Sequence, residues 1–151
     1  MGTIEEEIKQ QKKFGSEYEK AVVNILYTSS WLYNNNAVRM KKYGITPEQY
    51  NVLRILRGAY PKPTMLGDIT CRMLDKSSNA TRLVEKLRLK ALVDRQVCES
   101  NRRQVDIKIT AEGLSLLTQI DNESDEWYEN LKAITKTEAQ ELNRILDKLR
   151  S

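Results

Sequence analysis

The side chains of this sequence that could do chemistry are cationic and hydrogen-bonding, and they gather between Asp75 and Thr110. The stretch from Lys76 to Arg103 carries eight basic and three acidic residues, a net charge of +5, whereas the whole chain of 151 residues carries +4. The remainder is therefore close to neutral, at −1. Such clustering is the electrostatic footprint of a surface that binds a polyanion.

Other kinds of chemistry lack the residues they need. The chain has no histidine, and its two cysteines, Cys71 and Cys98, make neither a zinc cluster nor a disulfide framework. Without histidine the commonest general base and the usual nucleophile pairs are missing. No glycine-rich nucleotide motif or metalloprotease motif occurs. Lysines, tyrosines and carboxylates remain as acid–base groups, but no spacing pairs them. We therefore expect no enzyme, no metal site and no cofactor.

Length and composition indicate one globular domain. Forty per cent of the residues are hydrophobic and thirty per cent are charged. No apolar run approaches the roughly 20 residues that span a bilayer. The polar start of the chain lacks the apolar region of a signal peptide. We expect a cytoplasmic protein that is not in a membrane.

Helix starts are marked along the first half of the chain. Ser16 with Glu19 forms a predicted capping box for a helix that ends near Gly44. Thr46 and Gln49, around a proline, predict the start of the next helix, which we expect Gly58 to end.

Two further helices complete a helix-turn-helix pattern. We expect Thr64 to cap a short helix and Asp75 to be the N-cap of a helix from Lys76 to about Lys90. Ala80, Leu83, Val84 and Leu87 fall on one face of this helix, and Ser78, Arg82, Glu85 and Lys86 on the other, flanked by Asn79 and Thr81. Ser, Thr and Asn can meet base edges or phosphates, and Arg can bind guanine or phosphate through two hydrogen bonds.

A β-hairpin follows this helix. Leu92, Val93 and Val97 suggest one strand, and the alternating segment QVDIKIT predicts a second, with Val105, Ile107 and Ile109 inward. Between them CESNRR forms a tip that carries Arg102 and Arg103. Helix, helix and hairpin in this order are the layout of a winged helix-turn-helix.

The last third is helical again. We expect Thr110 to cap a long helix and Thr137 with Gln140 to form the capping box of another. The apolar residues of these helices are Leu114, Leu117, Ile120, Trp127, Leu131, Leu142, Ile145, Leu146 and Leu149. Together with the first helix they leave more apolar surface than a small winged domain can bury, which favours a helical dimer interface.

The segments GITPEQYNVLRIL, LDKSSNATRLVEKLRLKALV and NRRQVDIKIT followed by AEGLSLL resemble the MarR (multiple antibiotic resistance regulator) family of bacterial transcription factors. The resemblance implies a mainly α fold with a small β-hairpin wing: a winged helix-turn-helix over about 45–110, flanked by dimerisation helices over about 16–44 and 111–150, in a single domain over 1–151. It implies a homodimer that binds a pseudo-palindromic operator in double-stranded DNA, most often as a repressor, and is released by a small aromatic effector.

By this resemblance the recognition helix enters the major groove and a wing arginine the adjacent minor groove. The expected DNA-binding residues are Ser77, Ser78, Asn79, Thr81, Arg82, Lys86, Arg102 and Arg103, of which Ser77 could instead cap the helix. The sequence does not choose between the two arginines for the minor groove.

Two positions depart from the family pattern. Asn101 stands where the family has an Asp in its wing motif, so a carboxylate brace is lost, although an amide can still shape the turn. Ala91 stands where the family has Gly. A positive φ there would cost Ala about 1 kcal/mol, so we expect the local turn to differ. The reactive cysteine of the peroxide-sensing branch has no counterpart here.

Alternatives stand beside these interpretations. The basic helix face could be an ordinary solvated surface, and the winged domain a scaffold for a protein partner rather than a DNA reader. Tyr27, Trp31 and Tyr50 are candidates for an effector pocket, while core and interface packing is the commoner use of such residues. Cys98 could be an incidental surface thiol or, activated by nearby arginines, a redox switch. Cys71 is expected to be buried.

Overall fold

The computed structural model describes residues 2–129 and 132–151. Leu131, one of the expected apolar positions, lies outside these residues. The elements along the chain are α1 (Ile4–Glu7), α2 (Glu17–Lys41), α3 (Pro47–Ala59), β1 (Thr64–Met65), α4 (Leu66–Arg72), α5 (Ala80–Leu89), β2 (Val93–Cys98), β3 (Asn101–Ile109), α6 (Ala111–Asn122), α7 (Ser124–Glu129) and α8 (Lys136–Leu149). No helix in these two stretches is long and apolar enough to cross a membrane.

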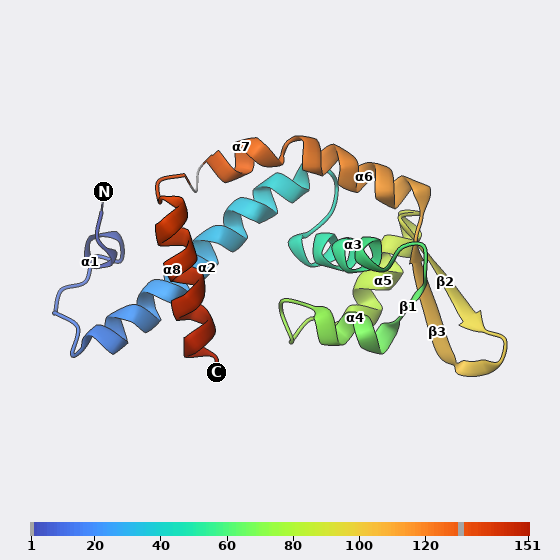
Figure 1. The fold of residues 1–151 in the computed structure, drawn as a ribbon, viewed down its shortest axis with the longest axis horizontal. Coiled ribbons are helices and arrows are strands. Elements are labelled where there is room, and N and C mark those ends of the chain that lie inside the picture. The colour runs from blue at the N-terminus through green and yellow to red at the C-terminus, as the bar shows by residue number, and fades with distance from the viewer. Residues whose placement is uncertain (1, 130–131) are drawn as a thin grey trace.

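The molecule has a winged part and a helical part (Figure 1). The winged part contains α3, α4, α5 and the sheet, and its hairpin of β2 and β3 projects away from the helices. The helical part is made of α2, α6, α7 and α8. In Figure 1, α6 and α7 run along the top of the molecule, above α3 and the C-terminal half of α2. The predicted fold, mainly helical with a small hairpin wing, is confirmed.

One hydrophobic core lies where α3 meets its neighbours. Leu53 and Leu56 of α3, Leu87 of α5, Ile107 of β3 and Leu117 of α6 are all almost completely buried. Because α3 contacts α2, α4, α5, α6 and β3, it ties the winged part to the helical part. The apolar stripe predicted for α5 is in this core, so its opposite face must point to solvent.

The sheet has the order β1-β3-β2, and all pairs are antiparallel. The first strand was not predicted: Thr64, expected as a helix cap, pairs with Ile107 of β3. Helix α4 therefore begins only at Leu66, with Met65 as an N-cap that makes no side-chain hydrogen bond. A strand of two residues is too short to show an alternating pattern in the sequence. It is defined only by its hydrogen bonds to β3, which lies far along the chain.

The DNA-reading candidate α5 begins later than predicted. Asp75, the expected N-cap, instead accepts hydrogen bonds from the amide and the hydroxyl of Ser77, at 2.9 and 2.7 Å. The true cap is Asn79, whose Oδ1 accepts from the amide of Arg82 at 3.0 Å. Both residue types are good caps, but the Ser77 hydroxyl holds Asp75 in a turn.

Helix ends elsewhere agree with the sequence in part. Ser16 caps α2, Thr46 and Gln49 form the predicted capping box of α3, and Thr110 caps α6. Gly58 does not end α3, which continues to Ala59 with Tyr60 as C-cap. Helix α1 lies in a segment for which no element was predicted.

The last helices differ from the prediction in two ways. The long helix expected after Thr110 breaks at Glu123 into α6 and α7. The capping box of α8 is formed by Thr135 and Glu138, two residues before the predicted pair. The sequence holds two candidate boxes two residues apart, and in the one that forms, the carboxylate of Glu138 accepts a hydrogen bond from the amide of Thr135 at 2.7 Å.

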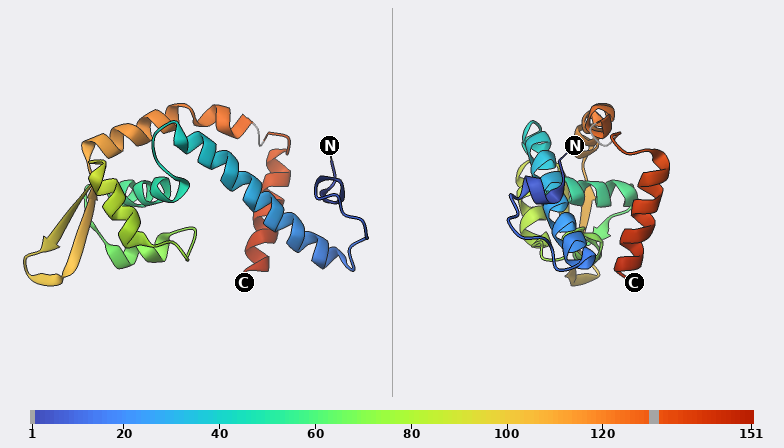
Figure 2. Two further views of the ribbon diagram at one scale, coloured as in Figure 1. Left: turned by 180° about the vertical axis from the view of Figure 1, so that it is seen from behind. Right: turned by 90° about the vertical axis from the view of Figure 1, so that its left-hand side faces the viewer.

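Two helices carry apolar faces open to solvent. On α2 these are Tyr18, Val22, Ile25 and Leu26, and on α8 they are Leu142, Ile145 and Leu149. The right-hand view of Figure 2 shows α8 standing apart from α2, so neither face covers the other.

Candidate nucleic-acid interface

Helix α5 presents an exposed polar face beside the wing. Thr81, Arg82 and Lys86 are exposed on it, while Ala80, Val84 and Leu87 on the opposite face are buried. Positions 82 and 86 are one turn apart, so both cations project from the same side of the helix. Asn79 lies at the N-terminus of this face, but its side-chain oxygen is engaged in the helix cap, which leaves only its amide NH2 to meet another molecule.

The two serines before α5 behave differently from each other. Ser77 is exposed and bonded to Asp75, and these bonds hold the pKa of that carboxyl below its ordinary value. The hydroxyl oxygen of Ser78 is buried and has no hydrogen-bond partner in the structure. Ser77 is therefore part of the turn before α5 and not a cap of that helix, which was the alternative left open by the sequence, and the hydroxyl of Ser78 points inward.

The wing arginines lie on β3 rather than in the turn. The turn consists of Glu99 and Ser100, because Cys98 already pairs with Asn101. The side chain of Asn101 accepts from the amide of Arg103 at 3.2 Å, so the amide shapes the wing as expected. The register shifts between Val97, which pairs with Val105, and Cys98, so Arg102 and Arg103 lie in an irregular, bulged part of β3. Arg103 lines a hollow beside β1 and α4 that also contains Asp68.

Four cations of this surface are free of acidic partners. Across residues 2–129 and 132–151, no carboxylate lies within 4.0 Å of Arg82, Lys86, Arg102 or Arg103. In contrast, Arg88 on the flank of α5 is bound by Glu85 through two hydrogen bonds, of 2.7 and 3.0 Å. This pair holds the pKa of Glu85 below its usual value. Exposed guanidinium and ammonium groups without an acidic partner are suited to phosphate oxygens.

The three candidate effector residues do not share one cavity. Trp31 lines a cleft of about 480 Å³ between α2 and α7, together with Trp127. Tyr50 lines a different hollow, between α2, α3 and the turn before α5. Tyr27 lines neither of these, and its hydroxyl donates to Glu7 of α1 at 2.7 Å. A role for any of them in effector binding stays a prediction.

The cysteines are placed differently from expectation. Cys71 is exposed on α4, so the prediction that it is buried is wrong. Cys98 is partly buried, and its pKa is lowered by hydrogen bonds from the Ser100 hydroxyl and the amides of the turn rather than by the arginines of the wing. Within the described residues no group of histidine, cysteine and carboxylate side chains could hold a metal ion.

One feature of this structure had no signal in the sequence. Arg39 of α2 reaches the break between α6 and α7, where it contacts Ser124 and Trp127. Residues 85 positions apart in the chain make this contact, and no local pattern indicates such a distant pair.

Comparisons with known proteins agree with this geometry. No family model matches the sequence. The HTH-type transcriptional regulator MgrA of Staphylococcus aureus is 26% identical over 117 residues, which cover 78% of this chain and 77% of MgrA. The structure of a MarR transcription factor from Planctomyces limnophilus is 26% identical, with a TM-score of 0.70, and the match covers 89% of this chain and 98% of that one.

More distant structures share the fold. Staphylococcus aureus MepR in complex with DNA has a TM-score of 0.76 at 20% identity, over 91% of this chain and 97% of that one. The organohalide-sensing regulator RdhR in its 2,4-dichlorophenol-bound form has a TM-score of 0.81 at 17% identity, over 93% and 86% of the two chains.

Fold and exposed cations together define a winged helix-turn-helix protein. Its similarities are to transcriptional regulators rather than to enzymes, and among these regulators they are to MarR-type proteins, as the sequence predicted.

Proposed function

We propose that the protein is a transcriptional regulator that binds double-stranded DNA as a homodimer and represses the genes beside its operator. The observation that carries this proposal is a group of four cations without acidic partners. Arg82 and Lys86 lie on the exposed polar face of α5, and Arg102 and Arg103 lie on β3. Phosphate contacts by these cations would supply most of the affinity, which makes binding steeply dependent on salt.

The proposed contacts divide between the two grooves. Thr81, Arg82 and Lys86 lie on α5, which would enter the major groove, with the free amide NH2 of Asn79 at its leading end. Arg102 or Arg103 would reach the minor groove, where a narrow A·T-rich segment attracts arginine. Ser77 and Ser78 would support these residues by shaping the turn before α5 rather than by reading bases.

A second copy of the chain accounts for the exposed apolar faces of α2 and α8. Covering such faces is the usual reason for a symmetric dimer. In the dimer two α5 helices, about 34 Å apart, would meet two half-sites on one side of the duplex. The same faces could serve another protein in a module that does not read DNA, and sedimentation of the isolated chain separates the two: a stable dimer supports the homodimer, and a monomer supports the module.

The proposal includes release of the DNA when a small effector binds. RdhR was solved with 2,4-dichlorophenol bound, and the cleft between Trp31 and Trp127 in this protein has aromatic walls and a volume suited to a molecule of that kind. Loss of the DNA complex on addition of phenolic compounds would support this part, and a complex unaffected by them would remove it.

The decisive experiment is selection of duplexes from a random pool at moderate salt. The protein is compared with the triple variant Arg82→Ala, Arg102→Ala, Arg103→Ala. The matched control removes three exposed lysines far from this surface, Lys12, Lys13 and Lys148, and so has the same net charge. A two-fold symmetric motif that is selected by the protein and the control, but not by the triple variant, supports the proposal. No enriched motif, or equal enrichment by all three, would overturn it.

A further inference from the structure

The break between α6 and α7 is held by one arginine from another helix. Nη2 of Arg39 donates to the carbonyl oxygen of Ile120, at 3.2 Å, and to the hydroxyl of Ser124, at 3.0 Å. Its guanidinium lies over the ring of Trp127, 5.4 Å from the ring centre. The Ser124 hydroxyl donates to the same carbonyl at 3.0 Å. Arg39 therefore contacts the last turn of α6 and both the first residue and the middle of α7.

The α6 side of this break is firmly anchored. Ile120 and Leu117 are completely buried in the core. Asp121 forms an ion pair with Arg57 of α3 at 2.5 Å. A second bond, from the hydroxyl of Tyr43 to Glu123, joins the end of α2 to the residue at the break, and burial and this carboxylate raise the pKa of Tyr43 to about 12. Tyr43 thus stays protonated and donates this bond at ordinary pH.

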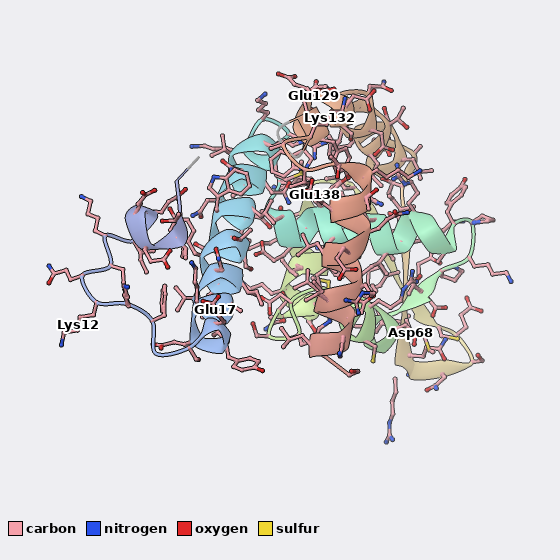
Figure 3. All side chains as sticks on the ribbon, turned by 60° about the vertical axis from the view of Figure 1, so that its left-hand side comes forward. Lys12, Glu17, Asp68, Glu129, Lys132 and Glu138 are labelled. Carbon is pink, nitrogen blue, oxygen red and sulfur yellow. The ribbon has the colours of Figure 1, made fainter. Side chains whose placement is uncertain are left out.

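Beyond the break, the described residues of the chain are less firmly held. We call residues 124–129 and 132–151 the C-terminal arm; none of its residues in α7 or α8 is buried. The ion pairs of the arm join residues three apart: Glu129 with Lys132, Glu141 with Arg144 and Asp147 with Arg150. Figure 3 shows Glu129 and Lys132 close together, with Glu138 of α8 below them and Asp68 of α4 well away from all three. Among the described residues, side-chain bonds from α2 to the break are thus what gives the arm its direction.

We propose that Arg39 is a positioning residue that locks the break between α6 and α7 and so fixes the direction of the C-terminal arm and, in the dimer, the spacing of the two DNA-reading helices. This inference rests on the proposed homodimer, in which α8 contributes an apolar face to the contact between copies. A change of direction at the break would displace α8 more than α7. It would therefore also displace the second chain of the dimer, which is proposed to contact α8.

The first test measures the arm within one chain, without DNA. One spin label is attached to the exposed Cys71 of α4 and another to Lys148→Cys in α8, in a Cys98→Ser background. Labelled chain is diluted into an excess of chain with both cysteines replaced by serine, so that only distances within a chain are read. We expect one narrow distance distribution. Arg39→Met, which keeps the aliphatic stem but loses the guanidinium, should broaden the distribution and shift its mean.

Arg88→Met is the matched control. Arg88 is also an arginine held by two side-chain hydrogen bonds, but its partner Glu85 belongs to the same helix, α5, so the pair joins no second element. Its loss should leave the distribution unchanged. Trp127→Leu, which removes the other half of the stacking contact, should reproduce the effect of Arg39→Met and replaces that variant if it does not fold. A distribution unchanged in both Arg39→Met and Trp127→Leu would overturn the proposal.

The second test reads the consequence for DNA. In duplex selection the protein should enrich half-sites at one spacing, whereas Arg39→Met should accept several spacings with the same half-site sequence. The same single spacing in both proteins would overturn the link to the operator. If the unaltered protein enriches no motif at all, the proposed function fails, while the spin-label distances still decide the role of Arg39.

Discussion

Residues with unusual backbone angles or unpaired polar atoms give the sharpest tests of this structure. Ala91 has a φ of 58°, in the left-handed region, and ends α5 with its amide bonded to the carbonyl of Arg88 at 2.9 Å. The expectation that the turn would differ from a glycine turn is therefore wrong: the turn is kept, and alanine adopts it. The next amide, of Leu92, bonds to the carbonyl of Leu87, which completes a glycine-type helix end.

Ala91→Gly should stabilise the protein. Removing Cβ relieves the left-handed strain, and part of the gain is offset by the greater freedom of glycine in the unfolded chain, leaving about 0.5–1 kcal/mol. Gly44, at φ 70°, is the matched control, because a Cβ added there would meet nothing within 4 Å and would feel only backbone strain. Gly44→Ala should lower the free energy of unfolding by about 1 kcal/mol. Urea titrations in which both changes have the same sign would contradict this account.

Thr64→Val should also stabilise the fold. Thr64 is 6% exposed, and its hydroxyl oxygen has no hydrogen-bond partner. Replacing an unsatisfied buried hydroxyl by a methyl group removes its desolvation cost, worth about 1 kcal/mol. Thr110→Val is the contrasting change, because its hydroxyl both caps α6 and donates to the carbonyl of Ala91, so about 1–2 kcal/mol should be lost. Thermal unfolding of the two variants decides, and a lower melting temperature for Thr64→Val would contradict the prediction.

At the scale of the element, α5 carries two kinds of arginine, one without an acidic partner and one in an ion pair. Arg82 has no acidic partner within 4.0 Å in the described part of the chain, whereas Arg88 on the same helix is held by Glu85. Arg82→Ala should weaken DNA binding about tenfold and reduce the slope of log affinity against log salt by about 1 if it contacts phosphate. If it reads a base, specificity should relax at one operator position.

Arg88→Ala is the control for this prediction, since it removes the same charge from the same helix. Its effect on affinity should be much smaller, because the guanidinium is already neutralised by Glu85. Gel shifts across a salt series measure both variants. Equal losses for Arg82→Ala and Arg88→Ala would show that α5 contributes only its net charge.

At the scale of the whole molecule, the exposed apolar faces predict that assembly and DNA binding are lost together. Ile145→Asp places a charge at the centre of the apolar face of α8, which is open to solvent in the single chain. The variant should sediment as a monomer, keep the circular dichroism of the winged part, and lose operator binding, since one half-site alone is bound weakly. Arg144→Ala, one residue away and paired only within its helix, should remain dimeric. If the Ile145→Asp variant is still a dimer, the contact between the two chains does not involve the apolar face of α8.

Much of the fold could be predicted from local patterns. The apolar stripe of α5, the alternation of β3 and the caps at Ser16, Thr46 and Thr110 are properties of neighbouring residues, so they can be read directly from the sequence. The cationic residues could be predicted for the same reason, because Arg82, Lys86, Arg102 and Arg103 follow closely in the chain and only β2 separates α5 from β3.

The tertiary structure decided where two local solutions competed or where the partner was distant. Asp75 and Asn79 are both good caps, and Thr135 and Thr137 both begin a capping box. Only the hydrogen bonds of the folded chain make Asn79 the cap of α5 and Thr135 the cap of α8. Strand β1 exists only because β3 supplies its hydrogen bonds, and the break before α7 is held by Arg39 from a helix far earlier in the chain. The sequence by itself determined the class of fold and the charge of the candidate DNA-binding surface, since both arise from short-range periodicity and composition. The direction of the C-terminal arm and the engagement of individual polar groups were decided only by the folded chain, because they depend on pairs of residues that no local pattern relates.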